Sequence, residues 1–141
     1  MTHVMTYDER AAAAQTQRRV RYAAAALTAL IAVLYVLIGF NVLTVLDAPG
    51  DQSFGFFAGA GYGLGVILLL SVRQRWVWMV GAVLQVFVMY TYFNLAVDRS
   101  PAYETWGIVL RVAQGLVLVA LLYLALRVPD ERPAESVPGE V

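Results

Sequence analysis

The stretch TWGIVLRVAQGLVLVALLYLAL, residues 105–126, carries a single formal charge, on Arg111. It has the length of an α-helix that crosses a hydrocarbon core of about 30 Å at about 1.5 Å per residue. Three other stretches are similarly long and apolar, and Arg21 is the only charged residue in them: residues 20–46, 54–72 and 76–97. A soluble fold could not bury four such segments and keep a polar surface. We therefore predict an all-α integral membrane protein, built as an antiparallel bundle of four transmembrane helices.

The composition argues against several kinds of function. Of the 141 residues, 60% are hydrophobic and 14% are charged, whereas soluble domains are about half apolar and about a quarter charged. The formal net charge is zero, which gives no indication of a nucleic-acid partner. The chain has no Cys and a single His, His3, so these residues build no disulfide, thiolate metal site, haem site or zinc site. We predict no cofactor and no bound metal.

The arginines predict the orientation of the helices. All ten basic residues are Arg, which we interpret as the codon usage of a GC-rich prokaryotic genome. Cytoplasmic segments of membrane proteins carry an excess of basic residues. Eight of the ten lie on one side of the predicted bundle: Arg10, Arg18, Arg19, Arg21, Arg73, Arg75, Arg127 and Arg132. We therefore place both termini on the cytoplasmic side of a prokaryotic plasma membrane and the loops at 47–53 and 98–104 outside.

The chain divides into three parts around the apolar stretches. Residues 1–19 form either a short interfacial helix or a disordered segment. A transmembrane domain at 20–127 holds helices at about 20–46, 54–72, 76–97 and 105–127. Residues 128–141 contain three prolines and four acids, a composition typical of a disordered tail. The first apolar stretch is longer than the about 7–15 residues of a signal-peptide core, so we assign it to the mature protein.

Glycines in the second apolar stretch predict close helix packing. Gly55, Gly59 and Gly63 form two consecutive GxxxG steps, and Gly61 with Gly65 forms a third on an adjoining face. Glycine lets two helix backbones approach closely, which favours association in lipid. We predict contacts of these glycines within the bundle, with self-association in an oligomer as the alternative.

Arg111 is the most informative residue of the chain. It lies five residues beyond Trp106, and ionisable residues at such depth are rare and commonly functional. One interpretation is structural: the side chain either extends to the headgroups or pairs with Glu104, seven residues earlier. The other interpretation is a binding site for an anionic group or a polar ligand.

Other polar residues lie at defined depths in the predicted helices. Gln85 and Gln114 are near the middle of consecutive helices, so we predict a hydrogen bond between them. Asn41, Tyr90 and Asn94 lie in the outer half at a depth similar to that of Arg111. If these side chains converge, they line a shallow polar cavity that opens to the outside. Gln85 and Asn94 are nine residues apart and cannot face the same pocket.

The last helix has two chemically different faces. Its small and polar residues predict a face turned toward the bundle: Glu104, Gly107, Arg111, Gln114 and Gly115. Its large aliphatic residues predict a face turned toward lipid: Leu110, Val117, Leu121 and Leu124. Near the start of the third stretch, Trp76 and Trp78 stand where an aromatic belt is expected.

The pattern gives little support for catalysis. No carboxylate lies inside a predicted span, no Ser lies near a His, and no metal ligands cluster. We predict a non-enzymatic protein that is an accessory or interaction subunit, or that binds a small or lipidic ligand at a polar site in its extracytoplasmic half. One alternative is an oligomeric channel or transporter for a small solute, and another is an enzyme that uses acids of the outer loops. The predicted partners are the lipid bilayer, a second copy or a larger membrane complex, and no nucleic acid.

Overall fold

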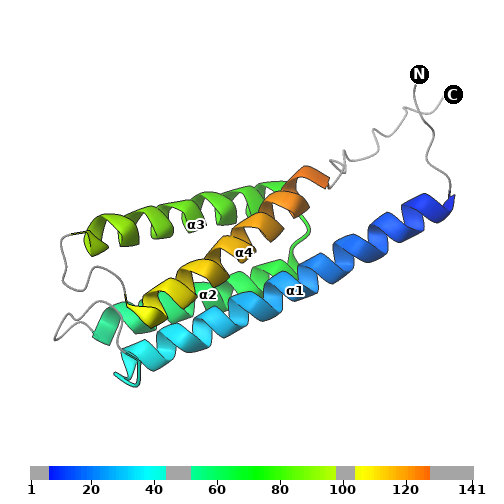
Figure 1. Ribbon diagram of the computed structural model, residues 1–141. Coiled ribbons are helices and arrows are strands. Elements are labelled where there is room, and N and C mark those ends of the chain that lie inside the picture. Colours follow the sequence, from blue (N-terminus) through cyan, green and yellow to red (C-terminus); the bar gives the residue numbers. More distant parts are fainter. Residues whose placement is uncertain (1–6, 44–51, 98–103, 128–141) are drawn as a thin grey trace, which may run out of the picture.

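The computed structural model describes residues 7–43, 52–97 and 104–127, and these residues are entirely helical apart from short turns (Figure 1). The helices are α1 (Tyr7–Gly39), α2 (Gln52–Ser71), α3 (Arg75–Ala96) and α4 (Thr105–Arg127). Each contains a segment long and apolar enough to cross a membrane. Within the described part of the chain, the prediction of an all-α protein with four helices long and apolar enough to cross a membrane is confirmed.

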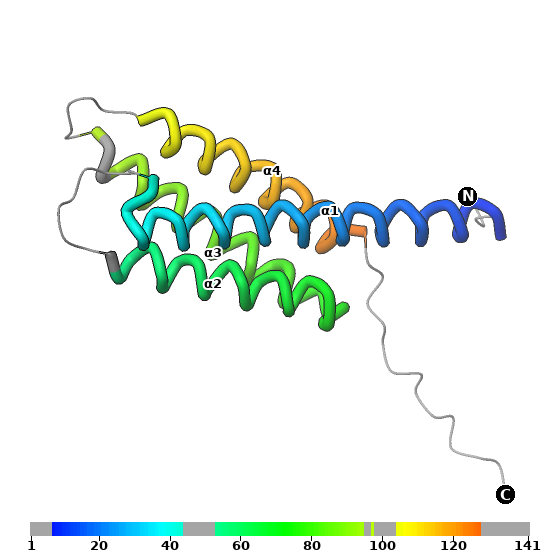
Figure 2. The backbone as a smooth tube through the Cα atoms, turned by 90° about the horizontal axis from the view of Figure 1, so that it is seen from below, coloured from blue at the N-terminus to red at the C-terminus, as the bar shows by residue number. Residues whose placement is uncertain are grey.

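The helix α1 begins earlier than the apolar pattern predicts. It starts at Tyr7 and runs for 33 residues, which corresponds to about 50 Å at the usual helical rise. Residues 11–14 are all Ala, the residue with the highest helix propensity. The first turns of α1 project beyond the other helices (Figures 1 and 2). Residues 7–16 are all exposed, so this part of α1 extends past the packed region.

The end of α1 is a capping turn that the apolar pattern does not reveal. The helix ends at Gly39, whereas the prediction extended it to 46; residues 44–46 lie outside the described residues. Asn41 has φ 57°, its N–H donates to Ile38 O at 2.9 Å, and the Val42 N–H donates to Leu37 O at 2.9 Å. This pair of bonds with a left-handed residue is a Schellman cap, which Asn tolerates.

The packing between helices is uneven. The helix α1 packs most extensively on α2, α4 packs on both α1 and α3, and α2 and α3 make few contacts. The buried apolar core draws on all four helices; its members include Ile31, Tyr35, Leu69, Trp78 and Leu124. Trp78 is 2% exposed, so of the two tryptophans expected in the aromatic belt only Trp76 is on the surface.

The predicted lipid-facing side of α4 is wrong. All four of its aliphatic residues are buried, at 6% exposure or less: Leu110, Val117, Leu121 and Leu124. The reason is the position of α4, which is covered by α1 on one side and α3 on the other. A helix with two neighbours buries its aliphatic face as well as its polar face.

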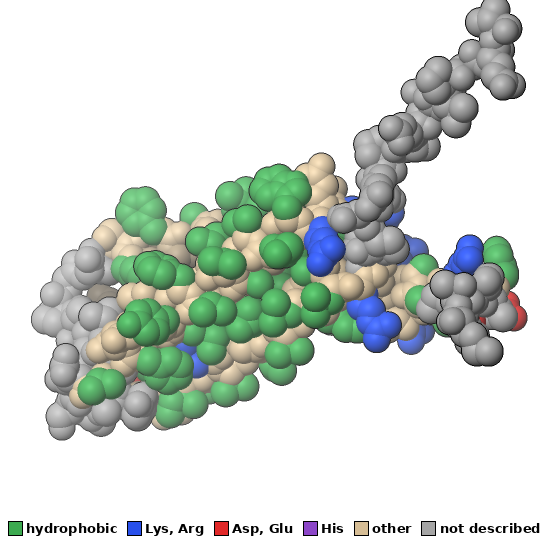
Figure 3. Space-filling model, turned by 90° about the horizontal axis from the view of Figure 1, so that it is seen from above, with side chains coloured by type: hydrophobic (Ala, Val, Ile, Leu, Met, Phe, Trp, Pro, Cys, Tyr) green, Lys and Arg blue, Asp and Glu red, His purple; other side chains and the backbone are tan. Residues whose placement is uncertain are grey.

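The outer surface separates into two regions (Figure 3). Hydrophobic side chains cover most of the helical body, and Arg side chains gather mainly at the end from which α1 projects. Three Arg–Tyr contacts lie in this region. The guanidinium groups of Arg18 and Arg21 are 5.6 Å and 5.8 Å from the ring centroid of Tyr22, and that of Arg127 is 5.8 Å from Tyr123.

Candidate functional site: a polar network and the Arg111 groove

Gln114 is the centre of a buried hydrogen-bond network. Its side chain lies on α4 and is 0% exposed. The amide nitrogen Nε2 donates to the hydroxyl of Tyr35 at 3.1 Å and to that of Tyr62 at 2.6 Å. The amide oxygen Oε1 accepts a hydrogen bond from Nη1 of Arg111. Both N–H donors and the carbonyl oxygen of one amide are therefore directed to three different side chains.

Gln85 closes this network from α3. The hydroxyl of Tyr62 donates to Gln85 Oε1 at 2.9 Å, and Gln85 Nε2 donates to the backbone oxygen of Gln114 at 3.2 Å. Each of the four helices thus contributes a residue, with Tyr35 on α1 and Tyr62 on α2. Unpaired polar groups are costly in an apolar interior, so this network ties the middle of the four helices together.

The two tyrosines of the network also stack. Their ring centroids are 5.4 Å apart and the ring planes differ by 18°. Sequence reasoning found Gln85 and Gln114 but missed Tyr35 and Tyr62. The signal was a tyrosine hydroxyl in the middle of an apolar stretch, because a buried hydroxyl usually has a hydrogen-bond partner.

Arg111 lies inside the packed region and does not extend to the surface. Its side chain is 7% exposed. The guanidinium carbon is 4.0 Å from the ring centroid of Tyr92 on α3, a cation–π contact. Nε of Arg111 is buried and has no hydrogen-bond acceptor. The guanidinium therefore has two neutral partners, the Gln114 amide and the Tyr92 ring, and a buried Nε without an acceptor.

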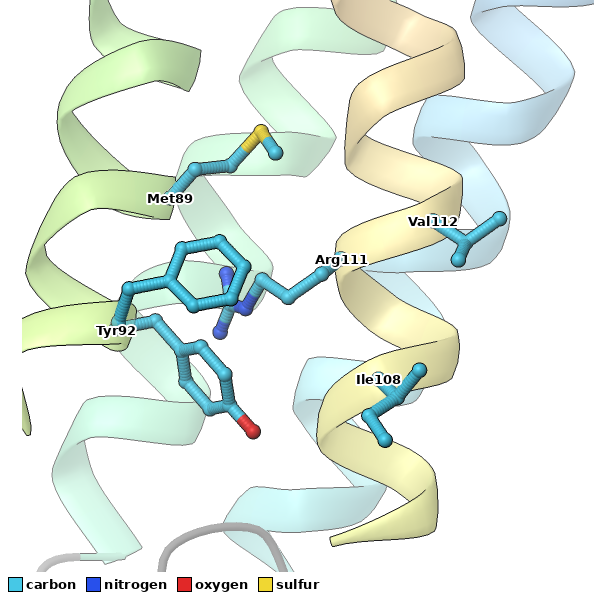
Figure 4. Close-up of a pocket in the computed structure, with 6 residues that line it drawn as sticks. Met89, Tyr92, Ile108, Arg111 and Val112 are labelled. Atoms are coloured by element: carbon cyan, nitrogen blue, oxygen red, sulfur yellow. The ribbon is translucent and has the colours of Figure 1, made fainter. Parts of the chain in front are cut away.

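A groove between α3 and α4 runs beside this guanidinium (Figure 4). It has a volume of about 270 Å³ and is open along its side. Figure 4 shows Arg111 reaching from α4 toward α3, with its guanidinium beside Tyr92. The lining consists of three residues from each helix: Met89, Tyr92, Phe93, Ile108, Arg111 and Val112. The surface that these residues present to the groove is apolar, and the polar atoms of Arg111 and Tyr92 lie behind it.

The other residues of the predicted outer cavity do not join Arg111. Asn94 is exposed and its Nδ2 donates to the backbone oxygen of Tyr90, one turn earlier, at 2.9 Å. Tyr90 is 66% exposed, and Asn41 is exposed in the cap of α1. Glu104 is partly buried just before α4, and its pairing with Arg111 stays a prediction. The described residues thus place Arg111 with Gln114, Gln85 and three tyrosines, away from Asn41, Tyr90 and Asn94.

The glycines of α2 divide into two groups. A Cβ added at Gly55 would lie 2.6 Å from Cα of Gly39, and one at Gly59 would lie 2.8 Å from Cγ2 of Val36. A Cβ at Gly65 would make an ordinary contact of 3.5 Å with Thr28. At Gly61 and Gly63 an added Cβ would meet nothing within 4 Å. Each step of four residues rotates by about 40° around a helix, so the second GxxxG step, at Gly63, has turned away from α1.

Three comparisons with known proteins give no relative for this chain. No protein-family model matches it, and neither a curated protein nor a solved structure is found to be similar.

Proposed function

We propose that this chain is a non-enzymatic, multi-pass protein of a prokaryotic plasma membrane, an antiparallel four-helix bundle with both termini in the cytoplasm. Two contact pairs support opposite directions of α1 and α2: Gly39 lies near Gly55, and Thr28 lies near Gly65. Opposite directions of α3 and α4 are supported by two further contact pairs, Tyr92 with Gly107 and Leu121 with Gly81. The excess of arginines on the side of the two termini supports the placement of both termini in the cytoplasm.

Single cysteines test this orientation, since the chain has no Cys of its own. We expect Ser53→Cys and Ser100→Cys to react with a membrane-impermeant thiol reagent in intact cells. Ser136→Cys should react only after the cells are permeabilised. Labelling of position 136 in intact cells, without labelling of the other two, would reverse the proposed topology. Residues 100 and 136 lie outside the described residues.

We further propose that the protein binds a small lipidic ligand in its extracytoplasmic half, at the groove between α3 and α4. The observation that carries this proposal is Arg111, a buried cation with an unused donor beside an apolar groove. Arg111 lies six residues after the first residue of α4, about 9 Å along the helix axis. An Arg at the membrane centre costs about 2.5–3.5 kcal/mol on insertion scales, so a buried one calls for a compensating role.

Retention of the ligand during purification tests this function. The protein is extracted from its own membranes in a mild detergent, and native mass spectrometry measures the masses that remain bound. We expect a defined bound mass with the parent and with the control Tyr90→Phe, whose hydroxyl is on the exposed side of α3. Arg111→Leu should lose it. A parent without a bound mass, or one with the same masses as Arg111→Leu, would contradict the proposal.

A further inference from the structure

We infer that the ligand of the groove is a single-chain amphiphile with a terminal carboxylate, of the fatty-acid class. Its carboxylate pairs with Arg111 and its hydrocarbon chain lies along the groove. This inference rests on the proposed ligand-binding function and adds the chemical class of the ligand.

The first argument is charge. An Arg side chain stays protonated in proteins, so Arg111 brings a full positive charge into the packed region. The partners that the structure gives its guanidinium, the Gln114 amide and the Tyr92 ring, are both neutral. They solvate the cation but do not neutralise it. An anion beside the guanidinium would neutralise this charge, and the low-dielectric environment would make the charge pair strong.

The second argument is the geometry of the guanidinium. Nη1 is engaged by Gln114, whereas Nε is buried without an acceptor. Nε and Nη2 together form one edge of the guanidinium. A carboxylate or a phosphate group matches such an edge with two parallel hydrogen bonds, which single-atom acceptors cannot do. The group that satisfies the unused Nε is therefore an anion that offers two oxygens, and the depth of Arg111 then favours a carboxylate over the phosphate of a phospholipid.

The third argument is the shape and lining of the groove. Its volume of about 270 Å³ is slightly below the about 300–1,000 Å³ of pockets that enclose a drug-sized ligand. It is open along its side, and most of its lining is hydrophobic, with Met89, Phe93 and Ile108 among its walls. Such a groove holds one hydrocarbon chain against the helices, while the outer side of that hydrocarbon chain contacts the surrounding lipid.

The fourth argument is depth, and it separates a fatty acid from a phospholipid. The headgroup zone adds about 5–8 Å on each side of the hydrocarbon core. We place Thr105, the first residue of α4, at the outer surface of the headgroups; Arg111 then lies about 9 Å deeper, below that zone. A phospholipid would have to draw its phosphate, glycerol and second chain inward to reach it. A fatty acid carries its charge directly at the end of its chain.

Thermal stability with four matched amphiphiles tests the inference in zwitterionic phosphatidylcholine nanodiscs. The probes are palmitate, hexadecanol, hexadecyl phosphate and phosphatidylglycerol. We expect palmitate to raise the Tm of the parent at concentrations at least about tenfold lower than hexadecanol, as loss of a charged hydrogen-bond pair implies. Hexadecyl phosphate and phosphatidylglycerol should be weaker than palmitate. Arg111→Leu should remove the preference for palmitate over hexadecanol, and Arg111→Lys should restore part of it.

A second pair of variants keeps the test independent of Arg111. Val112 lines the groove, and Val112→Trp should fill it and abolish the response to palmitate while Arg111 is unchanged. Val119→Trp is the control, because Val119 is two turns further along the same exposed side of α4 and is not part of the groove lining. It should respond to palmitate like the parent.

The outcomes distinguish this inference from the proposed function. Equal responses to palmitate and hexadecanol would overturn the carboxylate and leave a lipid-binding groove. A stronger response to hexadecyl phosphate or phosphatidylglycerol would overturn the carboxylate class and keep an anionic ligand. No response of the parent to any of the four would overturn both proposals. The same response in Val112→Trp as in the parent would place the binding site outside this groove.

Discussion

The contact of α1 with α2 and the contact of α3 with α4 are built differently. At Gly55 the backbones of α1 and α2 approach so closely that not even a methyl group fits. Between α3 and α4 the space is spanned by long side chains, Tyr92 and Arg111, and a groove remains. In lipid, helices associate through close packing and hydrogen bonds. The first contact uses packing and leaves no room, whereas the second uses polar and aromatic side chains and leaves a site.

The largest expected effect is at Gly55. Gly55→Leu forces a side chain against the backbone of Gly39, where an added Cβ alone would be 2.6 Å from Cα. We expect a loss of stability at or above the upper end of the about 1–3 kcal/mol typical of overpacking. Thermal unfolding in detergent, with size-exclusion chromatography as a check of folding, measures it. A variant as stable as the parent would show that α1 and α2 do not touch at this point.

The next effect is at the centre of the polar network. Gln114→Leu removes the bonds to Tyr35, Tyr62 and Arg111 and leaves the buried guanidinium with the Tyr92 ring alone. Side-chain hydrogen bonds in membranes average about 0.6 kcal/mol and reach about 1.7. For three bonds we expect a cost of about 2–3 kcal/mol in a reversible unfolding titration. An unchanged free energy of unfolding would mean that the network contributes no stability.

A smaller effect is expected at Tyr62. Tyr62→Phe keeps the ring that stacks on Tyr35 and removes two hydrogen bonds, one from Gln114 and one to Gln85. We expect a loss of about 1–2 kcal/mol, below that of Gln114→Leu, in the same unfolding titration. Tyr90→Phe is the control with the same chemical change on an exposed residue, and it should be neutral. Equal losses in both variants would point to a general effect of losing a hydroxyl.

The sequence predicts the helices well because charge is so sparse in each apolar stretch. It does not predict where α1 ends, since the apolar residues after Asn41 continue the pattern while the left-handed Asn41 and its two backbone bonds stop the helix. Nor does it predict that Leu110 and Leu124 are buried. Small, polar and aliphatic residues all occur on α4, and only the number of neighbouring helices decides which of them meet lipid.

The sequence predicts part of the candidate site, namely the residues whose chemistry is unusual in an apolar stretch. Arg111, Gln85 and Gln114 stand out because amides and a cation are unusual in an apolar stretch. Tyr35 and Tyr62 are a weaker signal: their hydroxyls lie in the middle of apolar stretches, but Tyr is also common at membrane interfaces. The groove has no sequence signal at all, since Met89, Phe93, Ile108 and Val112 are ordinary residues for a lipid-facing surface.

The smallest expected effect is at Gly63, which tests how far along α2 the close packing with α1 extends. Gly63 continues the GxxxG pattern of Gly55 and Gly59, so the sequence alone predicts a destabilising effect of Gly63→Leu. The structure leaves the space around Gly63 open, because two steps of four residues rotate it by about 80° from Gly55. We now expect Gly63→Leu to change the free energy of unfolding by less than about 0.5 kcal/mol, as surface substitutions usually do.

Unfolding measured at two protein-to-detergent ratios checks this expectation for Gly63→Leu. If Gly63→Leu is destabilising only at the higher protein concentration, the open glycine face binds a second copy of the chain. If it is destabilising at both, the packing of α2 extends further than the contacts with α1. If it is neutral at both, close glycine packing is confined to the end of α2 that meets Gly39, and the GxxxG pattern overstates the contact by one step.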